Sequence, residues 1–115
     1  MTKPVSHDAT SAAFALDELR RLESQLEASD FMLLETLRAR LECCARIAYH
    51  KDQHGMVLMQ PLATTRMKQR AGEFSEKYGI DPEFLQRVYS LIFSESDRIE
   101  RQTVAAARPK IAGIF

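Results

Sequence analysis

The sequence is poor in the residues that interrupt, turn or cross-link a chain. Its 115 residues include four glycines, four prolines, two cysteines and no tryptophan. The two cysteines are adjacent, at Cys43 and Cys44. A disulfide framework or a metal site would need more ligands and other spacing, so neither is expected. We interpret both cysteines as small, reduced residues in or beside the core.

An excess of charge of either sign is also absent. Sixteen basic residues balance sixteen acidic ones, which disfavours a nucleic-acid partner because phosphate binding relies on basic charge. No uncharged run is long enough to span a bilayer, and Met1 to Ser11 lack the apolar stretch of a secretory signal. We therefore expect a cytoplasmic protein with no nucleic-acid or membrane partner. A chain of this length forms one compact domain.

The apolar residues of the first half follow the period of a helix. Between Ser11 and about Lys51 there is no glycine or proline. Within that span, apolar residues recur at steps of three and four: Leu19, Leu22, Leu26, Leu33, Leu37, Cys44 and Ile47. This pattern predicts a single helix of about 40 residues.

Glycine and proline then mark two further helices. Pro61 suits the first turn of a second helix, for which Gly79 is a natural stop. Asp81 is a typical N-cap, followed by Pro82 at the first position of a third helix that runs to about Ala107. The fold class is therefore predicted to be all-α. We expect a helical domain over residues 11–107, flanked by a flexible tail at 1–10 and a tail at 108–115.

The predicted first helix is several times longer than the average of about 11–12 residues in soluble proteins. Two shorter helices of the same chain cannot bury its whole apolar stripe. The simplest remaining partner is a second copy of the chain. We therefore predict a homodimer.

Polar residues interrupt the apolar stripe of the first helix. Continuing its rhythm places Asp30, Arg40 and Lys51 at positions that should be apolar. Arg40 and Lys51 are eleven residues apart. They therefore point within about 20° of each other on a helix. Two cations on a buried face are costly unless an anion meets them.

The other two helices also turn polar groups towards the core. Ser96 lies on the stripe of the third helix, with Glu100 one turn beyond, and Gln60 and Thr64 begin the stripe of the second. Any one of these residues could be a register-setting polar group or part of an internal salt bridge. Taken together, they predict a polar, cationic pocket that binds a small dianionic ligand.

The order and spacing of these residues resemble the all-α chorismate mutases, over roughly residues 16 to 103. The likeness runs from Leu22, Leu26 and Asp30 through Leu33, Leu34, Leu37, Arg40, Lys51 and the Tyr78–Pro82 segment to Ser96 and Glu100. Within that superfamily, His54-Gly55 and Met59-Gln60-Pro61 look most like the 4-amino-4-deoxychorismate mutases of secondary metabolism. The resemblance implies an intertwined homodimer whose two active sites each use residues of both subunits.

The resemblance also implies a role for each candidate residue. Arg40 and Ser96 would bind substrate carboxylates, and Lys51 would reach the ether oxygen and a carboxylate. Glu100 stands where the family usually has Gln and some members have Glu. Gln60 and Thr64 stand where typical members have acidic residues that bind the ring hydroxyl.

Two arginines of the family pattern are missing. The arginine that reaches into the partner's active site aligns with Glu23, and Arg20 or its neighbour Arg21 could substitute for it. Ala63 replaces the other arginine, and Arg66 lies one turn further on. These departures leave open whether the substrate is chorismate or its 4-amino relative, and whether the enzyme is degenerate.

The implied reaction is an intramolecular [3,3] shift, which needs no metal, cofactor or nucleophile. The protein must hold the substrate folded and stabilise negative charge on the ether oxygen. A deprotonated Glu100 would oppose this, so we predict a raised pKa for Glu100, next to the substrate carboxylates. Isochorismate pyruvate-lyase activity on the same fold and a non-catalytic dimerisation module remain alternatives.

Overall fold

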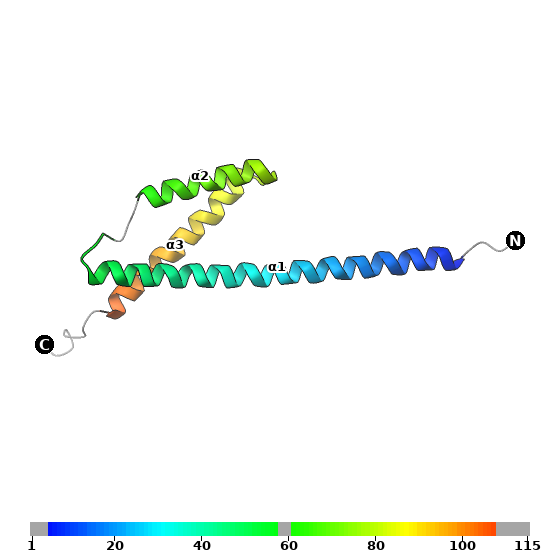
Figure 1. The fold of residues 1–115 in the computed structure, drawn as a ribbon, viewed down its shortest axis with the longest axis horizontal. Helices are drawn as coiled ribbons and strands as arrows, with labels where there is room; N and C mark the ends of the chain where they lie inside the picture. The colour runs from blue at the N-terminus through cyan, green and yellow to red at the C-terminus, as the bar shows by residue number, and fades with distance from the viewer. Residues whose placement is uncertain (1–4, 58–60, 108–115) are drawn as a thin grey trace. The chain divides into compact units, whose positions relative to one another are not determined.

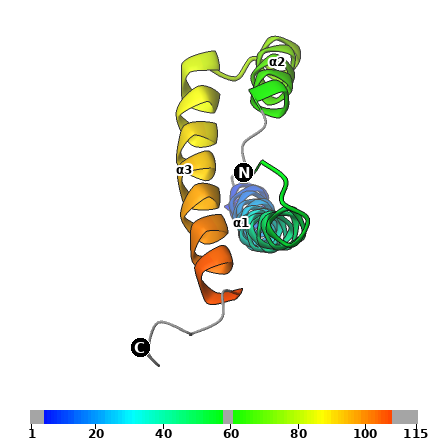
Figure 2. The ribbon, with the colours of Figure 1, turned by 90° about the vertical axis from the view of Figure 1, so that its left-hand side faces the viewer.

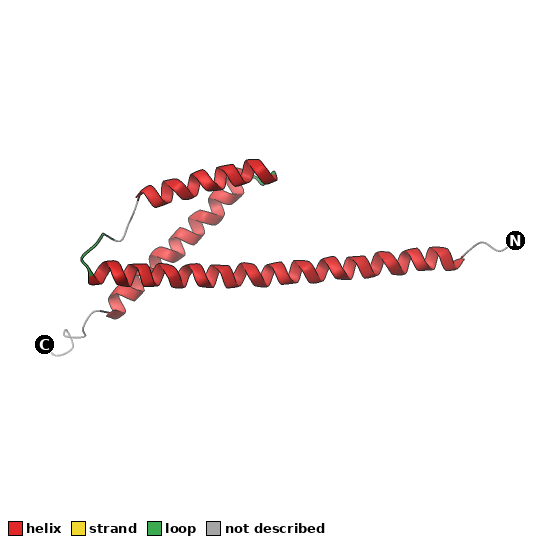
Figure 3. Ribbon diagram, in the orientation of Figure 1, coloured by secondary structure: helices red, strands yellow, loops and turns green. Residues whose placement is uncertain are grey.

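The computed structural model describes residues 5–57 and 61–107, with side chains described in 9–57 and 64–107. These residues form three helices: α1 (Val5–Gln53), α2 (Pro61–Tyr78) and α3 (Pro82–Ala107) (Figure 1). No strand occurs in the described ranges (Figure 3). The all-α fold with a very long first helix is therefore confirmed, and the domain limits and tails predicted above stay predictions.

The first helix is longer than its apolar pattern predicts. It has 49 residues and begins at Val5, six positions before Ser11. Its C-terminal end follows from Gly55, whose φ of 64° is a conformation that favours glycine. The Met56 amide donates a hydrogen bond of 2.7 Å to the Lys51 carbonyl. This 6→1 bond with glycine in between is the Schellman arrangement that ends helices, and it places Lys51 in the last turn of α1.

The turn between α2 and α3 is built in the same way, and the two helices form a hairpin (Figure 2). Gly79 has a φ of 66°, and the Ile80 amide donates to the Ser75 carbonyl at 3.1 Å. Asp81 then caps α3, because its Oδ1 accepts a hydrogen bond of 3.1 Å from the Glu83 amide. The predicted stop and N-cap are both confirmed.

The chain divides into two compact units, residues 1–39 and residues 40–115, so that α1 contributes to both. The second unit contains every side chain that is buried in the described part of the protein: Ala48, Ala71, Ser75, Ser96 and Val104. All five are small. Small side chains let helix backbones approach closely, and two of the five carry hydroxyl groups.

The first unit is a stretch of helix whose large apolar side chains face solvent. Its exposed residues are Phe14, Leu16, Leu19, Leu22, Leu26, Phe31, Met32, Leu33 and Leu34. Short-range ion pairs such as Arg21 to Glu18, at 3.1 Å, lie along the same stretch. Such exposed pairs contribute little to stability, so packing of the apolar residues must supply it.

Among the residues that the structure describes, no helix has both the length and the apolar character needed to cross a membrane.

Candidate active site

Arg40 and Ser96 form a direct contact between α1 and α3. The Arg40 Nη1 donates a hydrogen bond of 3.0 Å to the Ser96 hydroxyl oxygen. Ser96 is 6% exposed, and its own hydroxyl proton goes to the Ile92 carbonyl at 2.8 Å. A hydroxyl has one proton and two lone pairs, so these two contacts use it as donor and as acceptor. Its orientation in the site is fixed from both sides.

Lys51 and Glu100 belong to the same cluster. Lys51 is half-buried in the last turn of α1, and Glu100 lies one turn after Ser96 on α3. The charges of Lys51 and Arg40 both act on the Glu100 carboxyl and lower its pKa. The structure therefore brings together Arg40, Lys51, Ser96 and Glu100, as the apolar stripes predicted.

The net shift of Glu100 is nevertheless upward. Burial is the largest influence and raises the pKa of Glu100 above its ordinary value of 4.5, and the negative charge of Asp97 raises it further. These two effects outweigh the two cations. The predicted direction is confirmed: burial and Asp97 already raise the pKa of Glu100 in the protein itself.

Three other predicted site residues, Thr64, Gln60 and Arg20, stay predictions. Thr64 is half-buried in the first turn of α2 and makes no hydrogen bond to the described residues of the cluster. Gln60 lies outside the described residues. Arg20 is in the first unit, where it is exposed and lies 4.0 Å from Asp17. These three remain candidates on the sequence pattern alone.

Two contacts of Arg40 were missed by the sequence reasoning. Its guanidinium carbon lies 5.7 Å from the centre of the Phe93 ring, within the range of a cation–π interaction. Its Nη1 also lies 3.8 Å from the Cys44 sulfur. Cys44 follows Arg40 by four residues and Phe93 precedes Ser96 by three. Helical spacing around the two predicted residues was the signal that could have found both.

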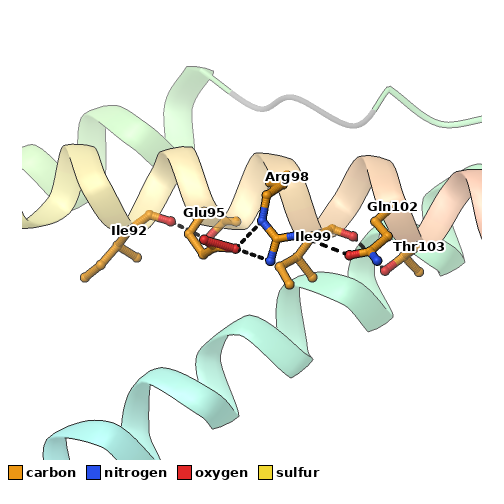
Figure 4. Close-up of polar contacts among 7 residues, drawn as sticks. Ile92, Glu95, Arg98, Ile99, Gln102 and Thr103 are labelled. Atoms are coloured by element: carbon orange, nitrogen blue, oxygen red, sulfur yellow. Dashed lines mark hydrogen bonds and ion pairs between the residues drawn. The ribbon is translucent and has the colours of Figure 1, made fainter.

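The charged residues on another face of α3 are engaged with one another. Arg98 donates hydrogen bonds to Glu95 and, at 3.4 Å, to Gln102 (Figure 4). On the same helix the Thr103 hydroxyl donates to the Ile99 carbonyl at 2.8 Å. Arg98 is therefore occupied by its own helix and does not add to the cationic cluster.

The described residues contain no group of three or more His, Cys, Asp or Glu that could hold a metal ion. Cys43 and Cys44 are both free, with Cys43 exposed and Cys44 half-buried. The chemical resources of the cluster are two cations, an oriented hydroxyl and a carboxyl group with a raised pKa. Such a set can bind carboxylates and stabilise developing negative charge.

Residues 22–101 match the chorismate mutase type II family. The chain belongs to this family. One relative, a 4-amino-4-deoxychorismate mutase from Streptomyces pristinaespiralis, is 36% identical over 103 residues, which cover 90% of this chain and 80% of the relative. A protein of the same name from Streptomyces venezuelae is 39% identical over 84 residues, covering 73% and 82%. No solved structure matches the chain significantly.

Membership of the family makes the chain an isomerase that carries out a chorismate mutase-type Claisen rearrangement. The resemblance to the all-α chorismate mutases found in the sequence is thereby confirmed, including the likeness to 4-amino-4-deoxychorismate mutases. Arg40, Lys51, Ser96 and Glu100 all lie inside the matched range.

Proposed function

We propose that this isomerase converts 4-amino-4-deoxychorismate to 4-amino-4-deoxyprephenate, with chorismate as the second candidate substrate. The observation that carries the proposal is the hydrogen bond from Arg40 to buried Ser96, in a cluster with Lys51 and Glu100. Both candidate substrates carry two carboxylates. The two relatives named above carry the name of the 4-amino reaction, which supports the amino substrate.

Arg40 binds a substrate carboxylate in this proposal, and Ser96 joins it by turning its hydroxyl proton from the Ile92 carbonyl to the carboxylate. A guanidinium can hold a carboxylate by two parallel hydrogen bonds, which fixes both its position and its orientation. Holding the substrate in its folded, reactive conformation removes part of the entropic barrier of the rearrangement. Arg40 is suited to this role because its side chain is already held against α3.

Lys51 donates to the ether oxygen of the substrate. The rearrangement breaks the bond between that oxygen and the ring while a carbon–carbon bond forms, so negative charge grows on the oxygen. A cation aimed at this position stabilises the transition state more than the ground state. When protonated, the form that its raised pKa favours, Glu100 donates a second hydrogen bond to the same region.

Gln60 and Thr64 bind the ring substituent. They replace the acidic residues of typical members, so the site offers neutral oxygen acceptors instead of carboxylates. A neutral site of this kind can accept hydrogen bonds from a ring amine. This is the second reason to place the amino substrate first.

The active enzyme is an intertwined, cytoplasmic homodimer in this proposal. Nine large apolar side chains of residues 1–39 are between 47% and 71% exposed in the single chain. A second copy would cover them. The partner's Arg20, or Arg21 beside it, then supplies the cation that Glu23 does not.

The deciding experiment incubates the protein with 4-amino-4-deoxychorismate, chorismate and isochorismate in parallel, with products identified by mass and chromatography. We expect rearranged product from the first two, with the amino substrate faster. The Lys51→Ala variant serves as the matched blank for contaminating activity. Release of pyruvate from isochorismate, without rearrangement of the other two, would instead assign the elimination reaction.

A further inference from the structure

The hydrogen bonds of Arg40 all leave from one end of its guanidinium. Nη1 has two protons, and the two described contacts, with Ser96 at 3.0 Å and with the Cys44 sulfur at 3.8 Å, account for both. Among the residues that the structure describes, none accepts a hydrogen bond from Nε or Nη2. These two nitrogens form the edge that binds a carboxylate side-on. The contacts at Nη1 therefore leave the carboxylate-binding edge available.

Phe93 supplies a third contact, because the guanidinium carbon of Arg40 lies over its ring. Its ring centre lies 5.7 Å from Cζ of Arg40, and the ring centre of Tyr89, one turn earlier on α3, lies 5.9 Å from that of Phe93. Phe93 and Tyr89 also line a cavity of about 210 Å³ between α2 and α3. Close packing therefore surrounds the Phe93 ring only in part, and its contacts with Arg40 and Tyr89 hold it.

Glu100 interacts with Arg40 through its charge, whereas the other acid of this region, Asp97, is engaged elsewhere. Asp97 follows Ser96 directly, but its Oδ2 lies 3.1 Å from Nε of Arg101. An arginine side chain has several rotatable bonds, and fixing it costs conformational entropy. Three contacts from three directions reduce that cost at the moment when a substrate binds.

We propose that Phe93 and Cys44 are positioning residues that hold Arg40 with its Nε–Nη2 edge directed at a substrate carboxylate. Ser96 shares this task and also touches the substrate, so it is a binding residue. The inference rests on the proposed function, in which Arg40 binds a carboxylate. It adds two residues that act through Arg40 and that touch no reacting atom.

The test is a double-mutant cycle between Phe93→Leu and Arg40→Lys, read as kcat and KM separately. Loss of positioning weakens binding of the substrate and of the transition state by the same amount. Phe93→Leu should therefore raise KM about five- to tenfold and leave kcat within about twofold. In the Arg40→Lys background the same substitution should change KM less than about twofold. An equal rise in both backgrounds would show that Phe93 does not act through Arg40 and would overturn the proposal.

Matched variants separate positioning from packing. Phe93→Tyr keeps the ring, and the adjoining cavity gives space for its hydroxyl, so KM should stay near the wild-type value. Phe74→Leu removes a ring that contacts Tyr78 at 4.6 Å and not Arg40, and should leave KM unchanged. Cys44→Ala should raise KM about twofold, and Cys44→Ser, which keeps an acceptor, should restore it. A Phe74→Leu variant as impaired as Phe93→Leu would indicate packing alone.

A spectroscopic readout keeps this inference separate from the proposed function. The ¹⁵N–¹H signal of the Arg40 Nε should shift in Phe93→Leu, because an aromatic ring beside the group is removed, and should not move in Phe74→Leu. If the wild type turns over no substrate, the proposed function fails, and this shift alone decides on the positioning. An unmoved Arg40 signal would overturn the positioning even in an active enzyme.

Discussion

The two units of the chain use apolar residues in opposite ways. In residues 1–39 the described side chains include large apolar groups such as Phe14, 71% exposed, and none that is buried. In residues 40–115 the buried positions are small, and Ser96 at 6% exposure is one of them. The first unit therefore exposes large apolar side chains, and the second buries polar side chains of the candidate site.

This difference suggests that the two parts of α1 have different roles. The part of α1 before Arg40 carries the residues expected to bind a second copy, and the part from Arg40 to Lys51 carries two cations of the site. Substitutions in the second unit should therefore affect chemistry in an intact dimer. Substitutions in the first should affect assembly, and activity only through it.

Lys51→Ala should cause the largest effect and should leave assembly unchanged. Removing a group that stabilises charge in the transition state lowers kcat about 10²- to 10³-fold. The measurement is steady-state kinetics beside the mass in solution and the melting temperature. Lys77→Ala, which removes a cation beside Tyr78 at the end of α2, is the control and should retain full activity. Near-normal turnover by Lys51→Ala would refute its role.

Leu26→Glu should break the dimer. Leu26 is 63% exposed in the single chain, and in a symmetric dimer each substitution counts twice. If each copy loses about 1.5 kcal/mol of apolar burial, dimer dissociation rises about 100-fold. Sedimentation across a concentration series measures this. Ser24→Glu places the same charge on the opposite face of the helix and should leave the dimer intact; equal weakening by both would point to net charge as the cause.

The ends of the helices could be predicted because local residues determine them. Gly55, Gly79 and Asp81 act through the backbone of their own turns, and Gly79 and Asp81 hold the positions expected of them. The start of α1 could not be predicted. Val5 to Thr10 carry no apolar stripe, yet nothing in them breaks a helix, so the periodic pattern begins later than the helix does.

The site was predictable where a polar residue interrupts an apolar pattern. Arg40, Lys51 and Ser96 stand out in this way. Phe93 and Cys44 do not, because an apolar residue on an apolar face looks like core whatever it touches. The spacing of four residues places Cys44 beside Arg40 on α1, whereas the contact of Phe93 with Arg40 depends on how α1 and α3 pack.

Arg20→Ala should have an intermediate effect on activity. It tests whether a residue of the first unit contributes to the active site. In the proposed dimer this arginine completes the partner's site, so its loss removes a charge-assisted hydrogen bond and raises KM about tenfold. The dimer should persist, because Arg20 is exposed and pairs with Asp17 at 4.0 Å. Arg21→Ala is the matched comparison: the larger KM change identifies which arginine replaces the cation missing at Glu23. No change in either variant would remove both from the site.

Glu100→Gln should have the smallest effect on activity at low pH. As pH rises, it should change the pH dependence of activity. Burial, aided by Asp97, raises the pKa of Glu100 above 4.5 in the folded protein. The protonated carboxyl donates a hydrogen bond, so activity should fall as pH rises through the folded-state pKa. Glutamine donates at every pH, so the variant should lose this fall and match the wild type within about twofold at low pH. A pH profile of kcat that Glu100→Gln leaves unchanged would exclude Glu100 as the titrating donor.

The stability of the same pair of proteins gives an independent check. The folded state binds the Glu100 proton more tightly than the unfolded state does, because its pKa is raised on folding. Its contribution to the free energy of unfolding is thus fully present below the unfolded-state pKa and is lost as pH rises through the folded-state pKa. Denaturant unfolding across this window should therefore show a downward slope in the wild type that is shallower in Glu100→Gln. Equal slopes would mean that Glu100 titrates alike in both states, and the pH dependence of activity would then need a different group.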